Sequence, residues 1–96
     1  MDSRNAARNA ITAQINALRT RRNETSNASE KAALGEAIAD LQDARNAIDE
    51  AANDAIGAEI GALVEKLEAV RTSHNLDAVS ALGRSVDRIR QATGSA

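Results

Sequence analysis

The chain offers few residues for catalysis. It has one histidine, His74, and no cysteine. A catalytic histidine of the serine-hydrolase type needs a nucleophile and an orienting acid beside the imidazole. The nearest acid in the sequence is Asp77, and both residues fall in a polar segment that we expect to be a loop. We therefore predict that His74 is solvated and that the protein is not an enzyme.

Carboxylates occur in two groups whose spacing places side chains on one face of a helix. These groups are Glu36, Asp40 and Asp43, and Asp49, Glu50 and Asp54. Helical di-iron sites also require Glu-x-x-His motifs on two helices, and hence at least two histidines directed inward. Because the chain has a single histidine, we interpret both groups as solvated faces and predict neither a metal nor a cofactor.

Arginines form the densest basic cluster. Arg19, Arg21 and Arg22 lie within four consecutive positions, and we expect Arg88 and Arg90 to join them from a later helix. Guanidinium groups can bind both phosphates and carboxylates. The chain, however, has a net charge of −2, a pI of about 5.3 and no aromatic residue on which a base could stack. The cluster therefore favours a protein partner over a nucleic acid.

Arg45 occupies a position that is expected to face another helix. It lies between Leu41 and Ile48 in an otherwise apolar seam. An unpaired arginine buried at such a position destabilises the folded state strongly. We predict that Arg45 pairs with an acid across a helix–helix interface and fixes the register there.

The apolar residues recur at the spacing of helices. Isoleucine, leucine and valine alternate at intervals of three and four residues, which is typical of narrow seams that face an antiparallel neighbour. Asn27 and Glu30 have capping-box spacing, whereas Asn75 is expected to cap the last helix with Asp77 in its first turn. We expect helices near residues 3–23, 28–52, 54–72 and 76–92.

The middle of the chain leaves two arrangements open. If Asn53 and Asp54 form a turn, two helical hairpins pack on each other as a four-helix bundle. If the helix continues from about residue 27 to residue 71, the fold has three helices and the middle one is about 66 Å long. The first and last helices would then lie end to end along this rod and leave part of its apolar seam uncovered.

The two halves of the chain resemble each other. Residues 11–23 match residues 63–75, and a second match joins residues 33–44 to residues 81–92, with an Ala-Leu-Gly triplet in both copies. Because the two matches are collinear, they predict a duplicated αα-hairpin.

The expected fold is thus an all-α helical bundle with coiled-coil-like packing and two repeated antiparallel αα-hairpins. The first repeat covers residues 3–52 and the second covers residues 54–93, within one domain of residues 1–96. Gly35 and Gly83, which are equivalent in the repeat, are expected to let the partner helix approach closely. Gly57 and Gly61 have the spacing of a similar tight contact.

Composition bears on stability and location. The chain has 96 residues and no Phe, Tyr or Trp, so its core depends on eighteen Ile, Leu and Val residues. A core of this kind predicts a marginally stable monomer, and we expect a homodimer.

No apolar run approaches the ~20 residues of a membrane span, and the polar N-terminus does not resemble a secretion signal. We therefore expect a cytoplasmic protein without membrane contact.

These observations favour a non-catalytic protein–protein interaction or assembly module, such as an adaptor or a small inhibitor of the kind that phages and mobile elements encode. One alternative is a structural coiled-coil segment of a larger protein. The other is a nucleic-acid-associated protein that uses the patch at Arg19, Arg21 and Arg22. The predicted partner-binding residues are Arg19, Arg21, Arg22, Arg45, Arg88 and Arg90.

Overall fold

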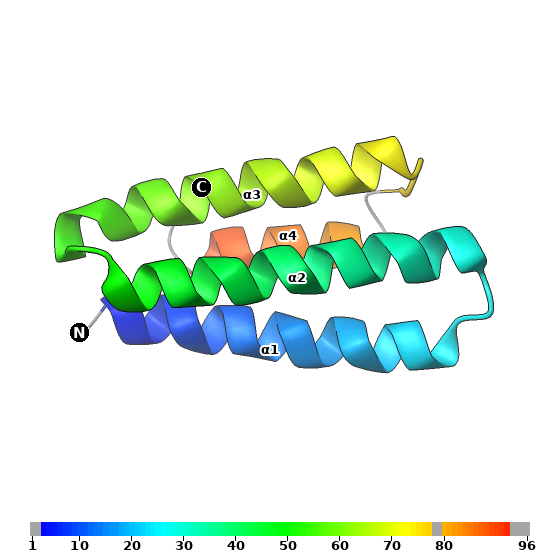
Figure 1. Ribbon diagram of the computed structural model, residues 1–96, viewed down its shortest axis with the longest axis horizontal. Coiled ribbons are helices and arrows are strands. Elements are labelled where there is room, and N and C mark those ends of the chain that lie inside the picture. Colours follow the sequence, from blue (N-terminus) through cyan, green and yellow to red (C-terminus); the bar gives the residue numbers. More distant parts are fainter. Residues whose placement is uncertain (1–2, 78–79, 93–96) are drawn as a thin grey trace.

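The computed structural model describes residues 3–77 and 80–92 of the chain. The described residues form four α-helices, and they contain no strand. The helices are α1 (Ser3–Glu24), α2 (Ala28–Glu50), α3 (Ile56–Ser73) and α4 (Ala81–Ala92), with a short 3-10 helix at Asn53–Ala55. They pack against each other as an all-α bundle, which confirms the predicted fold class (Figure 1).

Each helix lies mainly against two neighbours. α1 packs on α2 and α4, and α3 packs on the same two helices from the other side. Successive helices run in opposite directions along an elongated body of 39 × 21 × 17 Å (Figure 1). This order brings the first and last helices together, so that the arginine-rich ends of the sequence lie side by side. The duplication of a hairpin stays a prediction.

The chain turns between α2 and α3, so the alternative of one long middle helix is wrong. Ala51 and Ala52 have extended backbone conformations, which end α2 and precede the 3-10 helix. Neither glycine nor proline marks this turn. Arg4, a residue distant in the sequence, contacts it instead.

Arg4 caps the C-terminal end of α2 from the first turn of α1. Its guanidinium donates hydrogen bonds to the carbonyl oxygens of Ile48 at 3.0 Å, Asp49 at 2.9 Å and Ala51 at 2.7 Å. The last carbonyl groups of a helix have no partner within the helix, and a cation also interacts favourably with that end of the helix dipole. Arg4 therefore holds α1 and the end of α2 in register.

The core follows the predicted apolar seams. Every described isoleucine and valine is buried, as is every leucine except Leu76, which packs partly buried against the core. The predicted seam residue Val79 lies outside the described residues. In the described part of the chain the apolar seams are covered by the chain itself, so they leave no exposed seam for a second copy to cover. The homodimer stays a prediction that rests on composition.

Asn75 lies just past the C-cap of α3 and terminates that helix, so the prediction that it caps the last helix is wrong. Asn75 has a left-handed backbone with φ of 56°. Its N–H donates to the carbonyl of Thr72 at 3.1 Å, and the Leu76 N–H donates to that of Arg71 at 2.9 Å. This pair of bonds is a Schellman motif, in which asparagine is a common substitute for glycine.

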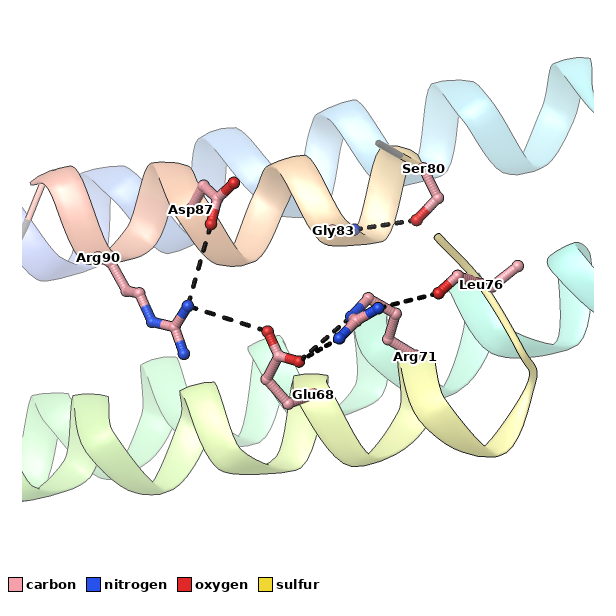
Figure 2. A network of polar contacts seen from close by, with 7 residues as sticks. All are labelled: Glu68, Arg71, Leu76, Ser80, Gly83, Asp87 and Arg90. Atoms are coloured by element: carbon pink, nitrogen blue, oxygen red, sulfur yellow. Dashed lines mark hydrogen bonds and ion pairs between the residues drawn. The ribbon is translucent and has the colours of Figure 1, made fainter. Parts of the chain in front are cut away.

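The predicted start of the last helix at residue 76 is therefore wrong. α4 begins at Ala81, and the Oγ atom of Ser80 accepts a hydrogen bond from the Gly83 N–H at 3.1 Å (Figure 2). Serine is a favourable N-cap because its short side chain satisfies one of the free N–H groups of the first turn. Asp77 precedes the helix and does not lie in its first turn. The ends of the other helices agree with prediction to within two residues.

The glycines do not support the predicted close approach of helices. A Cβ atom added at Gly35, Gly57 or Gly61 would meet no other side chain or helix within 4 Å. Gly83, by contrast, is buried in α4. The predicted packing role is therefore wrong for Gly35 and for the pair Gly57 and Gly61, because these positions face open space.

Candidate functional site

A groove between α1 and α4 is the candidate site. It encloses about 270 Å³ and lies at the C-terminal half of α1, where the first half of α4 packs on it. Three of the lining side chains are arginines, namely Arg21, Arg84 and Arg88, and one is the acid Glu24. These side chains give the lining of the groove an excess of positive charge.

The base of the groove is firmly packed. Ser85, which lines the groove, is 2% exposed, and its hydroxyl donates a hydrogen bond of 2.8 Å to Oε1 of Gln14 on α1. Leu18 is 1% exposed and contributes an apolar wall. Among the described residues, no buried side-chain nitrogen or oxygen lacks a hydrogen-bond partner. The two helices are therefore held at a fixed spacing beneath the arginines.

Arg21 stands at the edge of the groove and also contacts α2. Its Nε and Nη2 atoms lie 3.3 and 3.0 Å from the two carboxylate oxygens of Glu30. A hydrogen bond from the Thr25 hydroxyl, together with this guanidinium, lowers the pKa of Glu30 below its usual value. Arg21 thus shows the two-point binding of a carboxylate that arginine makes in its strongest ion pairs.

The structure brings together only some of the predicted arginines. Arg21 and Arg88 line the groove from opposite helices, whereas Arg19 and Arg22 are not among its lining residues. Arg19 is exposed and Arg22 is half-buried. Arg84 lines the groove and was not predicted. Its spacing of four residues from Arg88, which places both on one helix face, is the signal that would have identified it.

Arg90 belongs to a different set of contacts, on the side of α4 that meets α3. Its Nη1 atom lies 3.9 Å from carboxylate oxygens of both Glu68 and Asp87 (Figure 2). Glu68 also accepts hydrogen bonds from Arg71, and Arg71 donates to the carbonyl of Leu76 at 3.0 Å. This network joins α4 to the end of α3, so Arg90 has a structural partner away from the groove.

Arg45 does contact another helix, but with a different partner from the one predicted. Its Nη1 atom donates to the hydroxyl of Thr12 on α1 at 3.2 Å, and its side chain is half-buried. The interface position is as expected, whereas the hydrogen-bond acceptor is a hydroxyl and not a carboxylate. A half-exposed arginine needs no buried acid, because its guanidinium can remain hydrated while its stem packs.

His74 is more ordered than predicted. It forms the C-cap of α3, its side chain is 21% exposed, and Nε2 lies 2.5 Å from Oε2 of Glu36 on α2. The expectation of a solvated loop residue near Asp77 is therefore wrong. The imidazole joins the end of α3 to α2 and lines no part of the arginine groove.

The acidic groups do not converge. In the described residues, no three His, Cys, Asp or Glu side chains are placed to share a metal ion. Glu36 contacts His74, and Asp49 pairs with Arg8 at 2.8 Å. Burial raises the pKa of Asp40 above its usual value, although the nearby charge of Lys66 opposes this shift.

The bundle has one basic and one acidic side. α1 carries five arginines and one acid, and α4 carries three arginines and one acid. These two helices are neighbours in the fold. α2, with six acids and two basic residues, packs beside α3, which has three acids and two basic residues. Hence the groove lies on the face where positive charge is concentrated, which we call the basic face (α1 and α4).

No family model matches the chain, and neither a curated protein nor a solved structure matches it. The helices of the described residues also lack the combination of length and apolar character that a membrane span requires. The groove must therefore be interpreted from its own geometry and charge.

Proposed function

We propose that this protein is a non-catalytic protein-binding module that contacts its partner through the basic face. The observation that carries this proposal is the groove in which Arg21 of α1 lies opposite Arg84 and Arg88 of α4. Arginine is enriched at protein interfaces because it combines charge, several hydrogen-bond donors and a long apolar stem. An adaptor, an assembly subunit and an inhibitor would all use such a surface.

A non-catalytic role is supported by the placement of the titratable groups. Acid–base catalysis requires a proton-transferring group within hydrogen-bond reach of the substrate. His74 contacts Glu36 on α2 and does not line the groove, whose titratable lining residues are three arginines and Glu24. Among the described residues that line the groove, Glu24 is the one carboxylate.

The nucleic-acid alternative rests on the same arginines. It is disfavoured by the acidic side formed by α2 and α3, by the net charge of −2 and by the lack of aromatic residues. The coiled-coil alternative is disfavoured by the coverage of the apolar seams within the described chain. Self-association belongs to the proposal as well, and light scattering tests it by distinguishing a 10.1 kDa monomer from a dimer.

Site-specific photo-crosslinking tests the proposal. A photoreactive amino acid is placed at Ala17, an exposed residue that lines the groove, and in a control variant at Ala62, an exposed residue of α3. After irradiation of cells that produce each variant, we expect one predominant protein adduct from position 17 and none from position 62. Adducts that disappear on nuclease treatment, or equal adducts from both positions, would contradict the proposal.

A further inference from the structure

We infer that the chain dimerises by exchanging its second hairpin, formed by α3 and α4, with a second copy when the turn at residues 51–55 straightens. In this exchanged dimer, α3 and α4 of each copy pack on α1 and α2 of the other. The inference rests on the self-association in the proposed function and names the segment that moves. Because the apolar seams of the described chain are already covered, a second copy reaches them by replacing one hairpin.

The turn has a sequence that favours a helix. Three of its five residues are alanine, which has the highest helix propensity, and none is glycine or proline. The apolar positions also continue through the turn, because Ile48, Ala52 and Ile56 recur every four residues. Contacts with the rest of the fold, and not the local sequence, therefore account for the extended backbone of Ala51 and Ala52.

Arg4 stabilises the turn against straightening. Its guanidinium donates hydrogen bonds to the carbonyl oxygens of Ile48, Asp49 and Ala51, and to Oδ1 of Asn53 at 3.0 Å. In a continuous helix the same carbonyl groups accept hydrogen bonds from N–H groups four residues further along the chain. Straightening thus replaces the contacts of Arg4 by helical hydrogen bonds, and the dimer fraction depends on this balance and on the protein concentration.

The two hairpins are suited to move as units. Arginines join the helices within each hairpin: α1 is joined to α2 by Arg4, Arg8, Arg21 and Arg45, and α4 is joined to α3 by Arg90. The contacts between the hairpins include the Ser85–Gln14 hydrogen bond, which an exchanged hairpin makes again with the other copy. The two forms therefore differ mainly at the turn, which makes exchange a low-cost route to a dimer.

The first test measures the full chain by light scattering and NMR. Light scattering distinguishes the 10.1 kDa monomer from a dimer, and we expect the dimer fraction to rise with concentration. A mixture of ¹³C-labelled and unlabelled chains is then unfolded in urea, refolded and concentrated. We expect isotope-filtered NOEs between Ser85 of one copy and Gln14 of the other, because exchange brings these residues together from different chains.

The variant Ala52→Pro distinguishes exchange from other modes of dimerisation. Ala52 has φ of −68°, Ala51 before it has ψ of 150°, and the Ala52 N–H has no hydrogen-bond partner among the described residues, so proline fits the turn. Inside a straight helix, proline removes a hydrogen bond and clashes with the preceding turn. We expect the association constant of the dimer to fall at least about a hundredfold. For the control Ala52→Ser, a change of about fivefold or less is expected.

A second pair of variants tests the role of Arg4. Arg4→Met removes hydrogen bonds that the straight helix does not use, so we expect the association constant of the dimer to rise about tenfold. Arg8→Met removes the same charge from α1, but its ion pair with Asp49 lies within one hairpin in both forms. Its association constant should change less than about threefold. Circular dichroism confirms that each variant is folded.

Four results would overturn the inference: a wild-type chain that stays monomeric at millimolar concentration, a dimer without NOEs between Ser85 and Gln14 of different copies, an Ala52→Pro variant that dimerises like the wild type, or equal association constants for Arg4→Met and Arg8→Met. A dimer that persists in the second or third case retains the self-association of the proposed function and removes only the exchange. Failure of the crosslinking experiment, in contrast, removes the partner at the basic face. The two failures are therefore distinguishable.

Discussion

The hydroxyl of Ser85 on α4 donates a 2.8 Å hydrogen bond to Oε1 of Gln14 on α1, and the two residues are 2% and 7% exposed. This contact is a polar link in an interior whose other buried side chains, in the described part of the chain, are aliphatic apart from Thr25. It lies directly beneath the arginine groove. The spacing of α1 and α4, and hence the geometry of the candidate site, depends on it.

Replacing only one member of this pair should destabilise the protein. Ser85→Ala leaves the oxygen of Gln14 without its donor in a buried site, so we expect a loss of about 1–3 kcal/mol in the free energy of unfolding. The double variant Ser85→Ala/Gln14→Leu removes both polar groups and should recover part of that loss. Urea denaturation of the two single variants and the double variant gives the coupling, and strictly additive effects would contradict the account.

The capping of α2 by Arg4 predicts an unequal effect of two neighbouring arginines. Arg4→Met keeps the apolar stem but removes three hydrogen bonds to the end of α2, so we expect a loss of about 1–2 kcal/mol. Arg8→Met breaks only an exposed ion pair with Asp49, for which the expected loss is about 0–1 kcal/mol. Equal midpoints of chemical denaturation for the two variants would show that the cap contributes little.

The open space at the glycines predicts stabilising substitutions. Gly35 and Gly61 lie within helices, and an added Cβ meets nothing within 4 Å at either position. Because glycine is about 1 kcal/mol less favourable than alanine in a helix, Gly35→Ala and Gly61→Ala should each raise the free energy of unfolding by up to that amount. Since the residues lie on different helices, the effects should add in thermal melts. A lower melting temperature would indicate the close helix contact that the structure does not show.

The raised pKa of Asp40 predicts a pH-dependent substitution. Burial disfavours the ionised carboxylate in the folded state, so the folded protein binds this proton more tightly than the unfolded chain does. With Asp40 protonated, the folded state keeps its full stability at pH values below the pKa of this group in the unfolded chain, which is near 3.9. Part of that stability is lost as the pH rises through the higher pKa that Asp40 has in the folded protein. Asp40→Asn should therefore raise the melting temperature at pH 7 and have little effect at pH 3. An equal gain at both pH values would contradict this reasoning.

The sequence predicted the helices because their apolar periodicity is local. Ile11, Ile15 and Leu18, for example, recur at a spacing of four and three, and all three are buried on one side of α1. The ends of the helices were harder to predict, because the same residue type can occupy the N-cap of one helix or the C-terminal turn of another. Asn75 suits an N-cap and a left-handed C-terminal position equally well, and the choice depends on the backbone around it.

Contacts between residues that are distant in the sequence account for the remaining differences between the predicted and the observed fold. The turn at Ala51 and Ala52 contains no glycine or proline, and Arg4, which caps α2 there, is more than forty positions away in the sequence. The placement of α4 beside α1 follows from that turn. Arg88 could be proposed from charge alone, but its grouping with Arg84 and Arg21 in one groove required the fold.

The central claim is that the basic face binds a protein partner. Calorimetry with the protein captured by the crosslink at Ala17 tests it most directly. We predict that Arg84→Gln/Arg88→Gln weakens this complex about tenfold or more, whereas Asp43→Asn/Glu65→Gln, which removes two exposed charges from the acidic side, leaves the affinity within about threefold. Loss of binding in the acidic-side variant, with full affinity in the arginine variant, would contradict the account.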